Sequence, residues 1–353
     1  MGKSHPVYGL EEEVFILEPD RPTGRSLYYL ARLLWNNPGW YYTHSASNFT
    51  RGRDMRYGIV SGVELSTGRH DSITALLQDL ADRRRDLATV CEGLVCPIGN
   101  LPTRAQPSDT CGLHIHVSSI DREAAYLRLC RYLPVYALAL AHAPYAGGRR
   151  FGQSYRWANS FAIGPLREDP TYRFQDMIFS RRLGTLEIRV FDPSPDLSHI
   201  RNVLHSLAEL LSLGRGHVPA DAMDPAVLRS EYNYQRERLA RLRADDLPGG
   251  AADGVFGTHG TDLAGLVAEL HELAGFEAAW VQSTPADGTA ARLRESGLVP
   301  AYQELDDGYR RSAHAPPWNG KRMPLVLAAT AGVLGYYLPR MPYTVWKAWK
   351  EWH

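Results

Sequence analysis

The hydrophobic and polar positions of the chain follow two different periods. Four segments are rich in β-branched and aromatic residues or alternate with a period of two, which is typical of β-strands. We predict strands at residues 7–17, 57–65, 111–118 and 185–191. Longer segments of helical period separate these strands, so the sequence indicates a mixed fold of strands and helices.

Between the strands, apolar residues recur every three or four positions, as on the buried face of an amphipathic helix. One helix is predicted to follow Asp71, whose carboxylate can cap the first turn. A second helix is predicted to follow Asp196 and to stop at Gly214. The helix predicted at 121–142 contains Pro134, which lacks an amide hydrogen, so we expect a kink or a division there.

The composition changes after Arg243. Residues 247–259 are rich in glycine and lack a strong period, and helical periods return at 261–273 and 300–313. We therefore expect residues 244–353 to form a loop and a helical region packed on the same domain as residues 1–243. The apolar stretch 324–338 is shorter than the roughly 20 residues that cross a bilayer, which favours a buried helix over a membrane-contacting tail.

Composition excludes several classes of protein. The 353 residues have 44% hydrophobic content, enough for one large or two modest folded domains. The 39 basic and 39 acidic residues give no net field for nucleic acid or an anionic membrane, so neither is expected as a partner. The four cysteines form no C-x-x-C pair, and the first residues lack the apolar run of a signal peptide, so we expect a cytoplasmic protein.

Three consecutive glutamates lie inside the first predicted strand. Because neighbouring side chains of a strand point to opposite faces, Glu11 and Glu13 share one face while Glu12 lies on the other. Two carboxylates on one face repel each other unless a cation lies between them, so they are candidate metal ligands. A solvated edge strand is the alternative explanation. Glu64 is a further glutamate within a predicted strand.

Two later strands carry residues of matching chemistry. His114 and His116 share one face of their strand, and the apolar residues between them are expected to meet the helices. In the last strand, the same alternation places Thr185, Glu187, Arg189 and Phe191 on one face. That face offers a carboxylate for a cation and a guanidinium for phosphate. An ordinary cross-strand ion pair is the alternative for Glu187.

The combination of these residues indicates a magnesium nucleotide enzyme. Oxygen ligands on several strands, with one or two histidines, suit Mg²⁺ or Mn²⁺ better than Zn²⁺, which prefers nitrogen and sulfur. The chain contains neither G-x-x-x-x-G-K-[ST] nor G-x-G-x-x-G. A nucleotide would therefore be held on the sheet through the metal and arginine.

Four ordered motifs resemble those of a known family. They are GLEEE at 9–13, VELST at 63–67, DTCGLHIHVS at 109–118 and TLEIRVFD at 185–192. Their order and spacing are similar to those of glutamate–cysteine ligase family 2, the YbdK-type carboxylate–amine ligases, from about residue 7 to residue 243. The resemblance implies an α+β fold like that of glutamine synthetase, with a curved, mainly antiparallel sheet lining the active site and helices packed behind it.

The resemblance also implies an activity and a set of site residues. Residues 1–243 would form the catalytic core of an ATP- and Mg²⁺-dependent (or Mn²⁺-dependent) ligase that joins the γ-carboxylate of glutamate, or of a similar amino acid, to an amine such as cysteine through an acyl phosphate. The implied metal ligands are Glu11, Glu13, Glu64, His114 and Glu187. Arg189 and His116 would be catalytic, with Arg189, His114 and Arg173 binding ATP and Asn159, Ser160 and Arg173 on the substrate side. A homodimer is a candidate assembly.

Two other classes remain open at this point. Gly68 and Phe161 depart from the family pattern, which motivates a nucleotide- or amino-acid-binding protein that keeps the fold but has weak or no turnover. A zinc hydrolase built on His114 and His116 would need more histidine or cysteine ligands than these motifs supply.

Overall fold

The protein is described by a computed structural model that covers residues 6–20, 25–37, 46–47, 62–105, 110–159, 175–180, 183–213, 224–241, 263–282, 285–313 and 342. The strands are β1 (Val7–Leu17), β2 (Ala46–Ser47), β3 (Gly62–Ser66), β4 (Leu94–Cys96), β5 (Leu113–Ser118), β6 (Tyr145–Ala146), β7 (Arg149–Arg150), β8 (Met177–Ser180) and β9 (Thr185–Phe191). The helices are α1 (Ser26–Asn36), α4 (Ile73–Val90), α5 (Arg122–Ala139), α6 (Tyr155–Asn159), α7 (Leu197–Ser212), α8 (Pro225–Arg241), α9 (Leu263–Ala274), α10 (Ala279–Gln282), α11 (Pro285–Ser296) and α12 (Leu298–Ser312).

A seven-stranded sheet organises the described part of the chain. Its strand order is β2-β3-β1-β5-β9-β8, with β4 paired to one end of β1, and every pairing is antiparallel. The predicted α+β fold with an antiparallel sheet is therefore confirmed. Because β1 lies between β3 and β5, its glutamates are on a central strand, and the alternative of a solvated edge strand is wrong.

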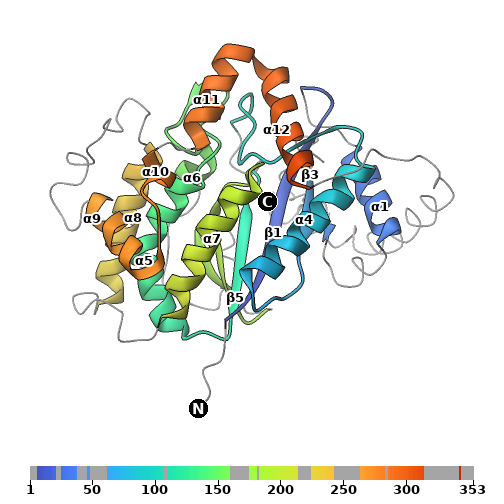
Figure 1. Ribbon diagram of the computed structural model, residues 1–353. Coiled ribbons are helices and arrows are strands. Elements are labelled where there is room, and N and C mark those ends of the chain that lie inside the picture. Colours follow the sequence, from blue (N-terminus) through green and yellow to red (C-terminus); the bar gives the residue numbers. More distant parts are fainter. Residues whose placement is uncertain are drawn as a thin grey trace.

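Helices cover one face of this sheet. Figure 1 shows α4 and α7 lying across β1 and β5, with α5, α8 and α9 to one side. Leu113, Ile115 and Val117 of β5 belong to the large core cluster, as predicted, together with leucines of α4, α5 and α7. Burial of apolar side chains on this face stabilises the fold and leaves the polar positions of the same strands on the opposite face.

The helix boundaries correct two sequence predictions. Helix α4 is capped by Ser72, whose hydroxyl accepts a hydrogen bond from the Ala75 amide, rather than by Asp71. Helix α7 does follow Asp196, whose carboxylate accepts from the first-turn amides. Helix α5 runs through Pro134 as a single element, so it is not divided there, and the kink stays a prediction. Surrounding core packing keeps the helix continuous where local propensity disfavours it.

The C-terminal helices pack on the same body as the sheet. Asp306 of α12 accepts a hydrogen bond from the Val95 amide of β4, and Arg310 donates to three backbone carbonyls at the end of α4. The proposed boundary near residue 243, the first residues of the strand predicted at 57–65 and the segments 247–259 and 324–338 lie wholly or partly outside the described residues. Across the described residues, no helix is both long and apolar enough to span a bilayer.

Candidate metal centre

The strand register brings the predicted polar residues to one face of the sheet. Glu11 of β1 lies opposite His114 of β5, and His116 lies opposite Glu187 of β9. On the other side of β1, Glu13 lies opposite Glu64 of β3. Directly opposite residues of an antiparallel pair have side chains on the same face, so all four motifs contribute residues to that face.

Three of these side chains form a compact cluster. One ligand atom from each of Glu11, His114 and Glu187 lies within 4.8 Å of the other two. Nδ1 of His114 is 3.5 Å from Oε2 of Glu11 and 4.0 Å from Oε1 of Glu187. His114 and Glu187 are buried, whereas Glu11 is partly exposed, so the cluster is open on one side. Two carboxylates and an imidazole at these separations form a donor set that suits a hard divalent cation.

A second imidazole faces the same carboxylate. Nε2 of His116 lies 3.5 Å from Oε2 of Glu11, and its Nδ1 is 3.0 Å from Oγ1 of Thr185. Nδ1 of His114 and Nε2 of His116 are both buried, and neither has a hydrogen-bond partner among the described residues. Buried polar atoms are nearly always satisfied, so two such nitrogens beside one carboxylate fit a site that receives a ligand.

The pKa values of the cluster reflect this crowding. Burial raises the pKa of Glu11, but the two histidines outweigh burial and hold that pKa well below its usual range. Burial, with Arg189 nearby, lowers the pKa of His114 far below the ordinary value, so this ring is neutral. Burial also acts to lower the pKa of His116, but the contact with Glu11 outweighs burial, so the pKa of His116 is raised. The cluster thus presents an ionised carboxylate and a neutral imidazole.

Two arginines border the cluster. Arg189 makes an ion pair with Glu187 two residues away on β9, so the cross-strand pair considered for Glu187 is not the one formed among the described residues. Arg156 enters from α6 and lies 3.3 Å from Nε2 of His114, while also donating to the carbonyl oxygens of Arg189 and Phe191. The site therefore places positive groups beside the carboxylates, as a metal-bound polyphosphate requires.

Arg156 is a site residue that the sequence analysis missed. It lies in a five-residue helix, which is too short to show a helical period. Its carbonyl partners, on Arg189 and Phe191, lie where the register between β5 and β9 shifts. The register shift there places one additional residue on β9, which also turns Phe191 into the core cluster. The prediction that Phe191 shares the face of Glu187 is therefore wrong, because a bulge interrupts the alternation.

The remaining predicted residues occupy different positions. Glu13 lies on the same face but outside the three-residue cluster, and its carboxylate accepts a hydrogen bond from the Gly112 amide at 2.8 Å. Glu64, opposite Glu13, also lies outside that cluster. Asn159 ends α6, but its side chain lies outside the described residues, as do Ser160 and Arg173.

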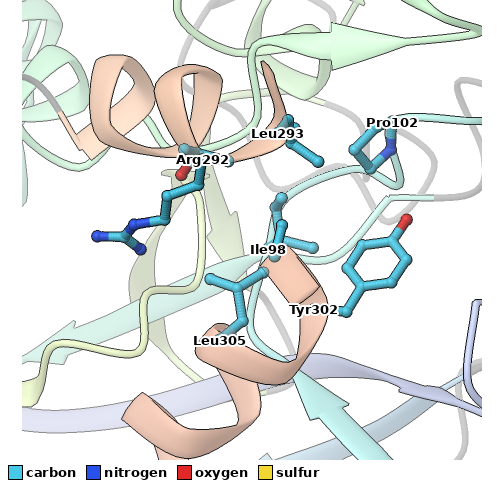
Figure 2. Close-up of a pocket in the computed structure, with 8 residues that line it drawn as sticks. Ile98, Pro102, Arg292, Leu293, Tyr302 and Leu305 are labelled. Atoms are coloured by element: carbon cyan, nitrogen blue, oxygen red, sulfur yellow. The ribbon is translucent and has the colours of Figure 1, made fainter. Parts of the chain in front are cut away.

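A recess elsewhere on the molecule has a different character. It lies where α11 and α12 meet the loop after β4, and Ile98, Tyr302 and Leu305 are among the residues that line it (Figure 2). The described residues that line it include no carboxylate or imidazole, so it lacks the candidate metal ligands that the sheet carries.

Comparison with known proteins defines the fold. No family model and no curated protein matches the chain. Among solved structures, several chains share this architecture. A glutamate–cysteine ligase from Francisella tularensis, in complex with AMP, aligns with 97% of this chain and 94% of its own, at a TM-score of 0.61 and 10% identity.

The second structure is a bifunctional glutathione synthetase from Pasteurella multocida. It aligns with 88% of this chain at a TM-score of 0.57 and 12% identity. The match covers 52% of the Pasteurella chain, so the present chain spans about half the length of that protein. At these identities, the likeness establishes a shared fold, and the activity is argued from the site.

Proposed function

We propose that the protein is an ATP- and Mg²⁺-dependent carboxylate–amine ligase. Its acid substrate would be glutamate or a similar amino acid, joined through the γ-carboxylate to an amine such as cysteine. The observation that carries this proposal is the cluster of Glu11, His114 and Glu187 on the polar face of the sheet. The fold shared with a glutamate–cysteine ligase supports the choice of reaction.

The reaction would proceed in two balanced steps. A carboxylate oxygen of the substrate attacks the γ-phosphorus of ATP, and the bond from that phosphorus to the bridging oxygen breaks to release ADP. The amine nitrogen then attacks the acyl carbon, a C–N bond forms, phosphate leaves with the electron pair of the C–O bond, and the amine loses a proton. Neither step needs a covalent bond to the protein, so position and electrostatics supply the catalysis.

The residues of the site would have different roles in this reaction. Glu11 and Glu187, with His114, would hold the divalent cation, which when bound neutralises charge on the phosphates. Arg189 would bind the transferred phosphoryl group. His116, whose Nε2 lies beside Glu11, would orient that carboxylate. We retain Glu13 and Glu64 as candidate ligands of a neighbouring cation, and Arg173, Asn159 and Ser160 as candidate nucleotide- and substrate-side residues.

The test is ADP release in the presence of Mg²⁺, ATP, glutamate and a panel of amines that includes cysteine. Wild-type protein should release ADP only when both acid and amine are present. The variant Glu187→Gln keeps the shape of the side chain but loses its charge, and we expect kcat to fall by about 100-fold or more, as for other electrostatic groups. Glu272→Gln, an exposed position on α9, is the matched control and should behave as wild type.

Equal ADP release by wild-type protein and Glu187→Gln would contradict the proposed site. Calorimetric binding of Mg-ATP without amine-dependent ADP release would instead support a nucleotide-binding protein on the same fold. Stoichiometric zinc in the purified protein would support the hydrolase alternative.

A further inference from the structure

Oxygen Oε2 of Glu11 is flanked by two imidazole nitrogens at the same distance. Nδ1 of His114 and Nε2 of His116 each lie 3.5 Å from it. Each ring is held by its other nitrogen, His114 by Arg156 at 3.3 Å and His116 by Thr185 at 3.0 Å. Arg156 and Thr185 therefore contact the two rings that face the Glu11 carboxylate.

Thr185 is well suited to hold a ring in one orientation. It is the first residue of β9, two positions before Glu187, and its hydroxyl meets His116 across the β5–β9 pair. A β-branched side chain on a strand has few χ1 rotamers, so its hydroxyl is fixed by the backbone. The hydroxyl can donate a hydrogen bond to Nδ1, which places the proton of a neutral ring on Nε2, directed at the Glu11 carboxylate.

We propose that Thr185 is a positioning residue of the metal centre. Thr185 contacts His116, and His116 lies 3.5 Å from Glu11. Through these two contacts Thr185 orients the Glu11 carboxylate for the divalent cation. The proposal rests on the metal site of the proposed function and adds a residue that the motif resemblance did not assign. Outer contacts of this kind typically change metal affinity by about 10- to 100-fold when they are removed.

The first experiment compares three variants by Mn²⁺ binding, measured from the electron paramagnetic resonance signal of free Mn²⁺ without nucleotide. Thr185→Val preserves the shape of the side chain but removes the hydroxyl, and we expect Mn²⁺ affinity to fall by about 10-fold or more. Thr185→Ser restores the hydroxyl and should recover most of the affinity. Thr89→Val removes a hydroxyl that donates to the Arg85 carbonyl within α4, so it should bind Mn²⁺ as wild type does.

A second measurement separates orientation from stability. In metal-free protein, a long-range ¹H–¹⁵N spectrum reports which ring nitrogen of His116 carries the proton, with its signals assigned by their loss in His116→Gln. We expect Thr185→Val to change the ¹⁵N shifts of His116 while the midpoint of thermal unfolding stays close to that of Thr89→Val. Unchanged His116 shifts and unchanged Mn²⁺ affinity in Thr185→Val would overturn the proposal.

These outcomes are distinct from failure of the ligase proposal. If Mn²⁺ binds and depends on the Thr185 hydroxyl but no amine releases ADP, the positioning role stands and the ligase reaction is wrong. If wild-type protein releases ADP and Thr185→Val matches it in Mn²⁺ affinity and spectrum, the positioning role alone is wrong.

Discussion

Gly112 directly precedes β5, and the side chains of Arg156 and His114 lie against its backbone. A Cβ atom at this position would lie 2.5 Å from Nη2 of Arg156 and 2.5 Å from Nε2 of His114. Real Cβ atoms do not approach other atoms so closely, so both side chains would have to move. The absence of a side chain at Gly112 is therefore part of the site.

We predict that Gly112→Ala weakens Mn²⁺ binding and lowers the free energy of unfolding by about 1–3 kcal/mol, the usual cost of overpacking. The control is Gly9→Ala on β1, where the nearest atoms would lie 3.7 and 3.9 Å from the added Cβ. Calorimetric unfolding and Mn²⁺ titration of the two variants check the prediction. Wild-type Mn²⁺ affinity in Gly112→Ala would show that the contact between Arg156 and His114 does not shape the site.

At the scale of elements, a buried ion pair joins β1 to α4 and α12. Glu12 lies on the core face of β1 and makes an ion pair with Arg84 of α4, and both side chains are fully buried. Arg84 also donates to the hydroxyl of Ser312 and lies over the ring of Tyr309, both in α12. The pair fixes the strand whose neighbouring residues, Glu11 and Glu13, face the site.

Removing one partner leaves the other charge buried without compensation. We therefore predict that Arg84→Met lowers the free energy of unfolding by about 3–5 kcal/mol. The double variant with Glu12→Leu should recover part of this loss, since no unpaired charge remains. Denaturant unfolding of both proteins is the measurement.

The control for this prediction is an exposed ion pair on the same helix. Arg85 and Asp82 are each about 40% exposed and 2.7 Å apart, so Arg85→Met should cost no more than about 1 kcal/mol. An Arg84→Met protein as stable as Arg85→Met would contradict the account of the buried pair.

The sequence predicted the positions of strands better than it predicted the contacts between residues far apart in the chain. The β-branched and aromatic residues of 7–17 and the alternation along 185–191 predicted β1 and β9, because both are local properties of a strand. The same alternation placed Glu12 on the core face but could not identify Arg84, 72 positions later, as its partner. It also missed the bulge at Phe191, and the short α6 that carries Arg156 has no periodic signal at all. Convergence of the site could be predicted, whereas its arginine contacts could not.

At the scale of the whole molecule, His142 links the end of the β5–α5 unit to the C-terminal helices. Its backbone amide donates to the buried carboxylate of Asp192, and its Nδ1 lies 2.9 Å from the hydroxyl of Thr289 in α11. The side chain is buried, and burial lowers its pKa from 6.5 to about 4. The neutral ring is therefore a requirement of the folded state.

This requirement gives a pH dependence of stability with a defined sign. Below pH 6.5 the unfolded chain binds a proton at His142 that the folded protein does not bind until about pH 4. Stability is thus complete above pH 6.5 and falls as the pH is lowered from 6.5 to 4, by roughly 3 kcal/mol from this group. We predict that His142→Asn, which keeps a polar atom near the Nδ1 position, loses this part of the dependence.

The measurement is the free energy of unfolding of wild-type protein and His142→Asn between pH 4 and pH 8. Their difference should change across the range from 6.5 to 4 and stay constant above it. His205→Asn, at an exposed position of α7, is the control and should track wild type. Parallel curves for wild-type protein and His142→Asn would contradict a buried neutral His142.

Glu11 and Glu187 are proposed to bind one divalent cation on the polar face of the sheet. The most direct test is a crystal structure with Mn²⁺ and a non-hydrolysable ATP analogue, with the metal located by its anomalous signal. We predict a peak in coordination contact with both carboxylates, between them and the phosphates of the nucleotide. A peak elsewhere, or no peak beside Glu11 and Glu187 at saturating Mn²⁺, would contradict the account.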